Sequence, residues 1–146
     1  MKIMKILLHL IASALACFVV ASLLHTQSVL NRLIELGINI PISNRISTVF
    51  ADLQGLAPTY GVILLAGLSI AFFVSSLLLK RFSTNPIIIY SIAGAVAVAT
   101  ILLAMQPILN ITLLGGARGT FGFLSQCLAG ALGGILFGAL RTQRKN

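Results

Sequence analysis

Four long stretches without a charged side chain constrain this chain more than any other feature. They cover about residues 6–24, 60–79, 87–105 and 121–140, and none contains Asp, Glu, Lys or Arg. About 20 apolar residues in helical form cross a bilayer core about 30 Å thick. Because lipid cannot satisfy backbone polar groups, single segments that span it are helical. The sequence therefore predicts an all-α, polytopic membrane protein with four transmembrane helices.

The composition argues against a soluble fold. Apolar residues make up 58% of the chain and charged residues 8%, whereas a soluble domain has about 25% charged residues. The length suits one domain, so residues 1–146 are predicted to form a single four-helix transmembrane domain. The net charge of +8 does not indicate a nucleic-acid partner, because the cations lie in short segments beside the apolar runs.

The first apolar run also has features of a signal peptide, because Lys2 and Lys5 precede it. The run continues to Leu24, which is longer than the usual apolar region of a signal peptide. We therefore interpret it as a retained transmembrane helix.

Loop charges predict the orientation. Seven cations fall on one side of the four spans: Lys2, Lys5, Lys80, Arg81, Arg141, Arg144 and Lys145. The other side has three cations and both acidic residues: Arg32, Arg45, Arg118, Glu35 and Asp52. Cytoplasmic loops carry the excess of Lys and Arg, so both termini are predicted to be cytoplasmic, in a bacterial inner membrane.

The outer loop, residues 25–58, shows helical periodicity of its own. Residues 28–36 place apolar side chains at helical spacing and are followed by Gly37. After Pro41, Ser43 is a candidate cap for a second short helix that ends near Gly55. These patterns predict two short amphipathic helices at the outer face of the membrane.

Parts of the chain resemble each other, which suggests a duplicated helical hairpin. Residues 11–16 resemble residues 92–97, and residues 23–31 resemble residues 102–110 after a two-residue gap. Thr59-Tyr60-Gly61 is echoed by Thr120-Phe121-Gly122. Each hairpin would start on the cytoplasmic side, cross to the outer side and return. The two would then be related by an axis along the membrane normal.

Small residues at four-residue spacing give each span a face suited to close helix contact, which carries much of helix association in lipid. The candidate packing residues are Gly122, Gly130, Gly134, Gly138, Gly67, Ala71, Ala95 and Ala99. Packing inside one chain and a homo-oligomer seam on the fourth span are both open interpretations.

Polar side chains near the outer face provide candidates for binding a small solute. They are Gln126, Gln27, Asn31, Gln106, Asn110 and Arg118, which would line an outer vestibule. Gln126 lies deep in a span, where a structural bond between helices is the alternative to substrate contact.

The sequence offers little reactive chemistry. Proton-coupled carriers keep an ionisable group in the membrane, and small multidrug exporters, similar in size, rely on a glutamate that these spans lack. His25 and Met105 could ligate a haem in principle, and Glu35 or Asp52 could supply acid–base chemistry, but no motif supports either. No metal, cofactor or enzymatic activity is expected.

The favoured function is therefore a non-catalytic membrane protein that acts as an oligomer or as an accessory subunit of a membrane complex. The alternatives are a small passive carrier or channel, and an outer-face enzyme or haem-binding protein. The expected partners are the bilayer and either a second copy or another membrane protein. The residues expected at lipid headgroups are Arg141, Arg144, Lys145, Lys80 and Arg81.

Overall fold

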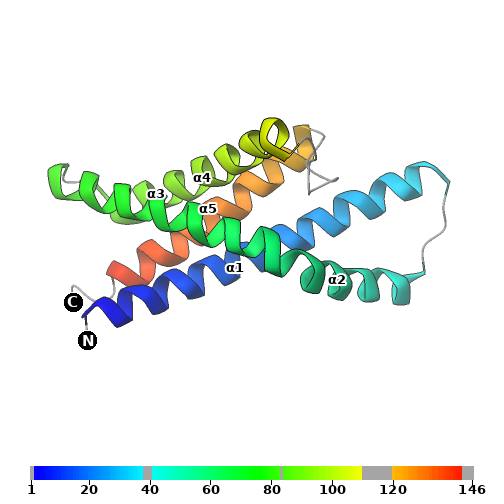
Figure 1. The fold of residues 1–146 in the computed structure, drawn as a ribbon, viewed down its shortest axis with the longest axis horizontal. Coiled ribbons are helices and arrows are strands. Elements are labelled where there is room, and N and C mark those ends of the chain that lie inside the picture. The colour runs from blue at the N-terminus through cyan, green and yellow to red at the C-terminus, as the bar shows by residue number, and fades with distance from the viewer. Residues whose placement is uncertain (1, 38–40, 83, 110–119, 143–146) are drawn as a thin grey trace.

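The computed structural model describes residues 2–37, 41–82, 84–109 and 120–142. In these residues the chain forms helices, in the order α1 (Lys2–Glu35), α2 (Ile42–Leu56), the π-helical turn η1 (Ala57–Gly61), α3 (Val62–Arg81), α4 (Pro86–Leu109) and α5 (Thr120–Thr142) (Figure 1). Four helical segments are long and apolar enough to cross a membrane: Met4–Glu35, Ile42–Arg81, Pro86–Met105 and Thr120–Thr142. For the described residues, the predicted all-α fold with four helices long and apolar enough to span a membrane is confirmed.

The first span is longer than the sequence indicated. Residues 28–35 are the last turns of α1, not a separate helix, because no helix-breaking residue lies between them and the apolar run. The chain leaves the helix at Gly37, whose φ of 83° suits glycine, and the Gly37 amide donates to the carbonyl of Ile34 at 2.9 Å.

The second span also begins earlier than predicted. Helix α2 is preceded by Pro41 without a side-chain cap from Ser43, passes through Gly55, and runs into α3 by way of η1. Pro58 lies at the start of η1. Proline has no amide hydrogen and its ring crowds the preceding turn, and a wider π turn is one way for a helix to accommodate such a residue. The helical path therefore continues past Pro58.

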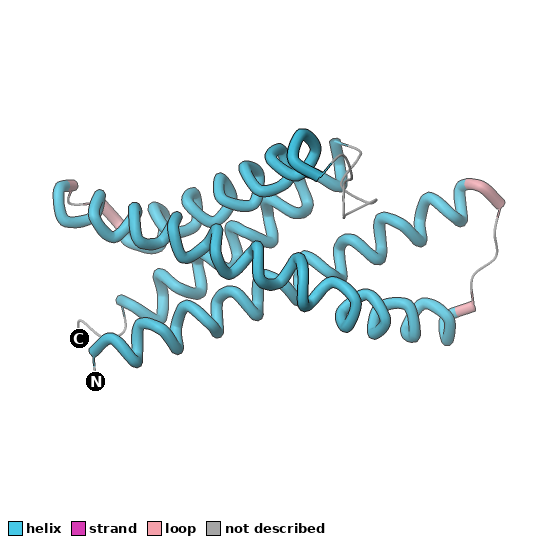
Figure 2. Tube along the Cα trace, in the orientation of Figure 1, coloured by secondary structure: helices cyan, strands magenta, loops and turns pink. Residues whose placement is uncertain are grey.

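Helix α5 is the central element of the bundle. It packs most extensively on α4 and next on α1, while α3 packs on α4 (Figure 2). Methyl groups placed on Gly94 and Gly130 would each overlap the other residue's carbonyl oxygen, and one on Gly134 would overlap the Tyr90 carbonyl. The backbones of α4 and α5 are therefore in direct contact.

The other predicted packing residues divide between buried and partly exposed positions. Gly122 and Gly138 are buried on α5, and a methyl group on Gly138 would lie 2.8 Å from the Ile87 Cα. On α5, Gly133 faces α1, where a methyl group would lie 2.9 Å from the Cys17 Cβ. Partly exposed positions are Gly67, Ala71, Ala95 and Ala99. On α4 the buried face is instead formed by residues such as Tyr90, Gly94, Val98 and Leu102.

The two ends of the bundle differ. Both termini and the turn between α3 and α4 lie at one end, whereas the loop between α1 and α2 lies at the other (Figure 1). Near that loop, α1 and α2 extend past the rest of the molecule and diverge (Figure 2).

The duplicated hairpin remains a prediction. Helices α4 and α5 pack extensively on each other, whereas α1 and α3 have few mutual contacts and pack instead on α5 and α4.

Candidate functional site

A polar pocket lies at the end of the bundle that holds both termini. It has a volume of about 460 Å³ and lies where α3, α4 and α5 meet. Its lining combines two cations with hydroxyl and apolar side chains: Ser76, Leu79, Lys80, Phe82, Thr84, Pro86, Tyr90, Arg141 and Thr142. We call this site the cationic pocket.

Aromatic packing holds Tyr90 in place beneath the pocket. Phe72 and Phe137 stack with ring centroids 4.5 Å apart, and Tyr90 meets both rings edge-on, at 5.7 Å and 4.9 Å. The Tyr90 side chain is fully buried. Because edge-to-face contacts restrict the ring, the Tyr90 hydroxyl has a defined position.

Arg141 joins α5 to α3 and α4 through this hydroxyl. Its Nη1 donates to Ser76 Oγ at 2.6 Å and to Tyr90 Oη at 2.7 Å, and the guanidinium carbon lies 5.7 Å from the Tyr90 ring centroid. Ser76 donates its own proton to the Phe72 carbonyl at 2.7 Å. In the 2.9 Å contact between Ser76 and Tyr90, the tyrosine is therefore the donor.

The partners of Arg141 in this network are neutral. The only acidic side chains of the chain, Glu35 and Asp52, lie on the helices beside the opposite loop. Within the described residues, no carboxylate bonds to this partly buried guanidinium. Such a guanidinium favours a bound anion, since hydrogen bonds to ionised partners are about twice as strong as neutral ones. The arrangement can bind an anion.

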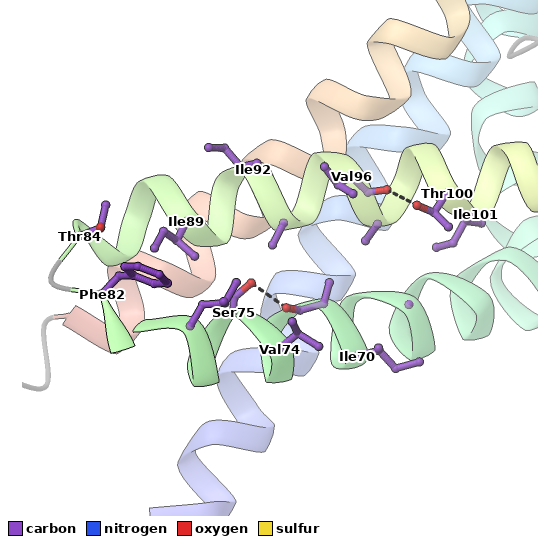
Figure 3. A pocket seen from close by; sticks show the side chains of 15 residues that line it. Ile70, Val74, Ser75, Phe82, Thr84, Ile89, Ile92, Val96, Thr100 and Ile101 are labelled. Carbon is purple, nitrogen blue, oxygen red and sulfur yellow. Dashed lines mark hydrogen bonds between the residues drawn. The ribbon is translucent and has the colours of Figure 1, made fainter. Parts of the chain in front are cut away.

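An apolar groove continues from the pocket along the bundle. It has a volume of about 720 Å³ and lies between α3 and α4 (Figure 3). Phe82 and Thr84 line both the groove and the cationic pocket. Most of the other lining residues are aliphatic, including Ile70, Val74, Ile89, Ile92, Val96 and Ile101.

Gln126 forms a second polar centre, in the middle of the bundle. Its Nε2 donates to the Ala21 carbonyl at 2.8 Å, and its Oε1 accepts from the Tyr60 hydroxyl at 3.3 Å. Both Tyr60 and Gln126 are almost fully buried. The amide thus links α5 to α1 and η1, and it lines neither the cationic pocket nor the groove.

The vestibule stays a prediction, because the structure describes only three of its six proposed side chains. Gln27 and Asn31 lie four residues apart at exposed positions of α1, and Gln126 is buried on α5. Asn110, Arg118 and the side chain of Gln106 lie outside the described residues.

Among the outer-face candidates, Asp52 joins α2 to α1. Thr26 donates to Asp52 Oδ2 at 2.7 Å, and His25 is buried beside it on α1 with no hydrogen bond to Nδ1. Glu35 is exposed, and Met105 is buried on α4. Within the described ranges, no group of three or more His, Cys, Asp or Glu side chains is placed to hold a metal ion.

The predicted headgroup cations divide into three groups. Arg141 and Lys80 line the cationic pocket, Arg81 is exposed beside it, and residues 144 and 145 lie outside the described part of the chain. Sequence reasoning missed Tyr90 and Ser76. A tyrosine inside an apolar span is a usable signal, because a buried phenol needs a hydrogen-bond partner.

No protein-family model, curated protein or solved structure matches the chain.

Proposed function

We propose that this chain is a non-catalytic subunit of a membrane complex in a bacterial inner membrane, with both termini in the cytoplasm. The observation that carries the proposal is a largely exposed apolar stripe on α2. Ile42, Ile46, Phe50 and Leu53 follow one another at helical spacing on this stripe. Leu53 packs on the core of the bundle, whereas the other three are 76%, 55% and 63% exposed.

The stripe is largely exposed because α2 diverges from α1 toward the loop (Figure 1). The Thr26–Asp52 bond joins the two helices only near the bundle. A contiguous exposed apolar face of this kind marks a protein or membrane contact. We infer that a second copy of the chain or another membrane protein covers it.

The buried polar groups support a structural role over a catalytic or transport role. Gln126, Tyr60 and Tyr90 form hydrogen bonds that link helices. Used in this way, they stabilise the bundle.

The cation distribution supports the proposed orientation. Lys80 and Arg141 lie toward the end of the bundle that holds both termini, whereas the two acidic residues lie on the helices beside the opposite loop (Figure 1). By the positive-inside rule, the first end faces the cytoplasm.

Photo-crosslinking in intact cells tests the subunit proposal. A photoreactive phenylalanine at position 50 is expected to give one discrete adduct, either at twice the chain mass of 15.4 kDa or at the mass of one defined partner. The matched control is the same group at the exposed Asn44, which lies on another face of α2. Monomer alone at position 50, or equal adducts at both positions, would contradict the proposal.

A further inference from the structure

We propose that the cationic pocket and the apolar groove together bind one anionic phospholipid. Its phosphate lies at Arg141 and Lys80, and one acyl chain lies between α3 and α4. This site is separate from the α2 stripe, so the inference stands independently of the proposed subunit role.

The cationic pocket and the apolar groove are continuous but differ in polarity. Phe82 and Thr84 border both, at the turn between α3 and α4 (Figure 3). A ligand that extends past this turn would place one part among cations and the other among aliphatic side chains. A phospholipid has this division of polarity.

The headgroup end has the chemistry of a phosphate site. Arg141 is held by Ser76 and Tyr90, so its guanidinium is ordered before a ligand arrives. Lys80 adds a second cation on the pocket wall. Both residues lie at the ends of apolar helices, where the polar headgroups of a bilayer begin.

The groove is suited to a hydrocarbon chain because the two hydroxyl groups along its length, those of Ser75 and Thr100, are already bonded within their helices. Ser75 donates to the Ala71 carbonyl at 2.7 Å, and Thr100 donates to the Val96 carbonyl at 2.8 Å (Figure 3). Neither proton is then available to a ligand. A polar ligand would gain nothing there, whereas an acyl chain would fill the space.

The geometry favours a lipid over a free anion. Inorganic phosphate would occupy only the pocket of about 460 Å³ and leave the adjoining groove of about 720 Å³ unused. A phospholipid would occupy both cavities, because its phosphate and its acyl chain belong to one molecule.

Native mass spectrometry of the delipidated full chain tests the headgroup. Phosphatidylglycerol is expected to bind about tenfold more tightly than phosphatidylcholine with the same acyl chains. Both lipids carry a phosphate, but phosphatidylcholine adds a quaternary ammonium that the pocket cations Arg141 and Lys80 repel. Arg141→Gln should remove that preference, and Arg81→Gln, at an exposed cation outside the pocket, should retain it. Lys80→Gln provides a second loss-of-charge variant if Arg141→Gln does not fold.

A second arm tests the acyl chain. Ala93→Leu fills the groove from α4 and should weaken phosphatidylglycerol binding several-fold, while Ala66→Leu at an exposed position of α3 should not. Equal binding of the two lipids, or equal loss in Arg141→Gln and Arg81→Gln, would overturn the inference. Full displacement of the lipid by millimolar inorganic phosphate would also overturn it and identify a free-anion site.

Discussion

At the scale of single residues, this chain uses its few buried polar side chains to join helices. Gln126 bonds to α1 and η1 near the middle of the bundle, and Tyr90 bonds to Arg141 and Ser76 near one end. In lipid, an unsatisfied amide or phenol costs free energy because no water replaces the lost partner. These side chains therefore specify which helices are neighbours.

We expect Gln126→Leu to lower the free energy of unfolding by about 1 kcal/mol, the scale measured for interhelical hydrogen bonds in membranes. The variant removes the donor to the Ala21 carbonyl and the acceptor of the Tyr60 hydroxyl. Reversible unfolding in mixed micelles measures the change.

The matched variant Tyr60→Phe completes a double-mutant cycle with Gln126→Leu. Because the two side chains share the 3.3 Å bond, their effects should not add. Unchanged stability in Gln126→Leu would refute the structural role. Loss of solute flux at unchanged stability would instead favour the carrier.

At the scale of elements, glycine decides how closely α4 and α5 approach. Gly94, Gly130 and Gly134 bring the two backbones into contact, whereas α3 contacts α4 less extensively and leaves the groove open. The sequence pattern identified the glycines of α5. It did not show that α4 presents Tyr90 and Gly94 to them, because several faces of that helix carry small residues.

Gly134→Ala is expected to lower the free energy of unfolding by about 1–3 kcal/mol, the usual cost of overpacking. Its methyl group would overlap the Tyr90 carbonyl oxygen.

The control for this variant is Gly55→Ala in α2, where nothing lies within 4 Å of the added carbon. Alanine is favoured over glycine in helices by about 0.5–1 kcal/mol, so this control should be neutral or stabilising. Similar unfolding midpoints for the two variants would show that the α4–α5 contact is looser than described.

At the scale of the whole molecule, the helical segments fall into two groups by length. Helices α4 and α5 have 24 and 23 residues, or about 36 Å and 34 Å at 1.5 Å per residue, close to the bilayer core. The 34 residues of α1 and the 40 from Ile42 to Arg81 reach about 51 Å and 60 Å. We infer that the surplus projects from the outer face, where the stripe on α2 is available to a partner.

Cysteine labelling of intact cells tests this orientation. After Cys17 and Cys127 are replaced with alanine, an impermeant maleimide should label Leu36→Cys but label Phe82→Cys only after permeabilisation. Both positions are exposed and follow directly on α1 and α3, whose C-terminal ends lie toward opposite ends of the bundle (Figure 1). The reverse pattern would invert the proposed topology.

The sequence by itself determined the four apolar segments and the excess of cations on one side of them. The segments follow from the transfer free energies of individual side chains, and the excess follows from the positions of the cations between the segments, so neither needs knowledge of tertiary neighbours. It also marked Arg141 and Lys80 as headgroup residues, from charge and position alone.

Only the tertiary structure decided that Arg141 meets Ser76 and Tyr90, that Gln126 meets Tyr60, and that a groove adjoins the cationic pocket. Apolar burial gives little preference among helix faces in lipid, so close van der Waals fit and a few hydrogen bonds select the neighbours. Those depend on the positions of atoms from helices far apart in sequence, which a local pattern does not encode.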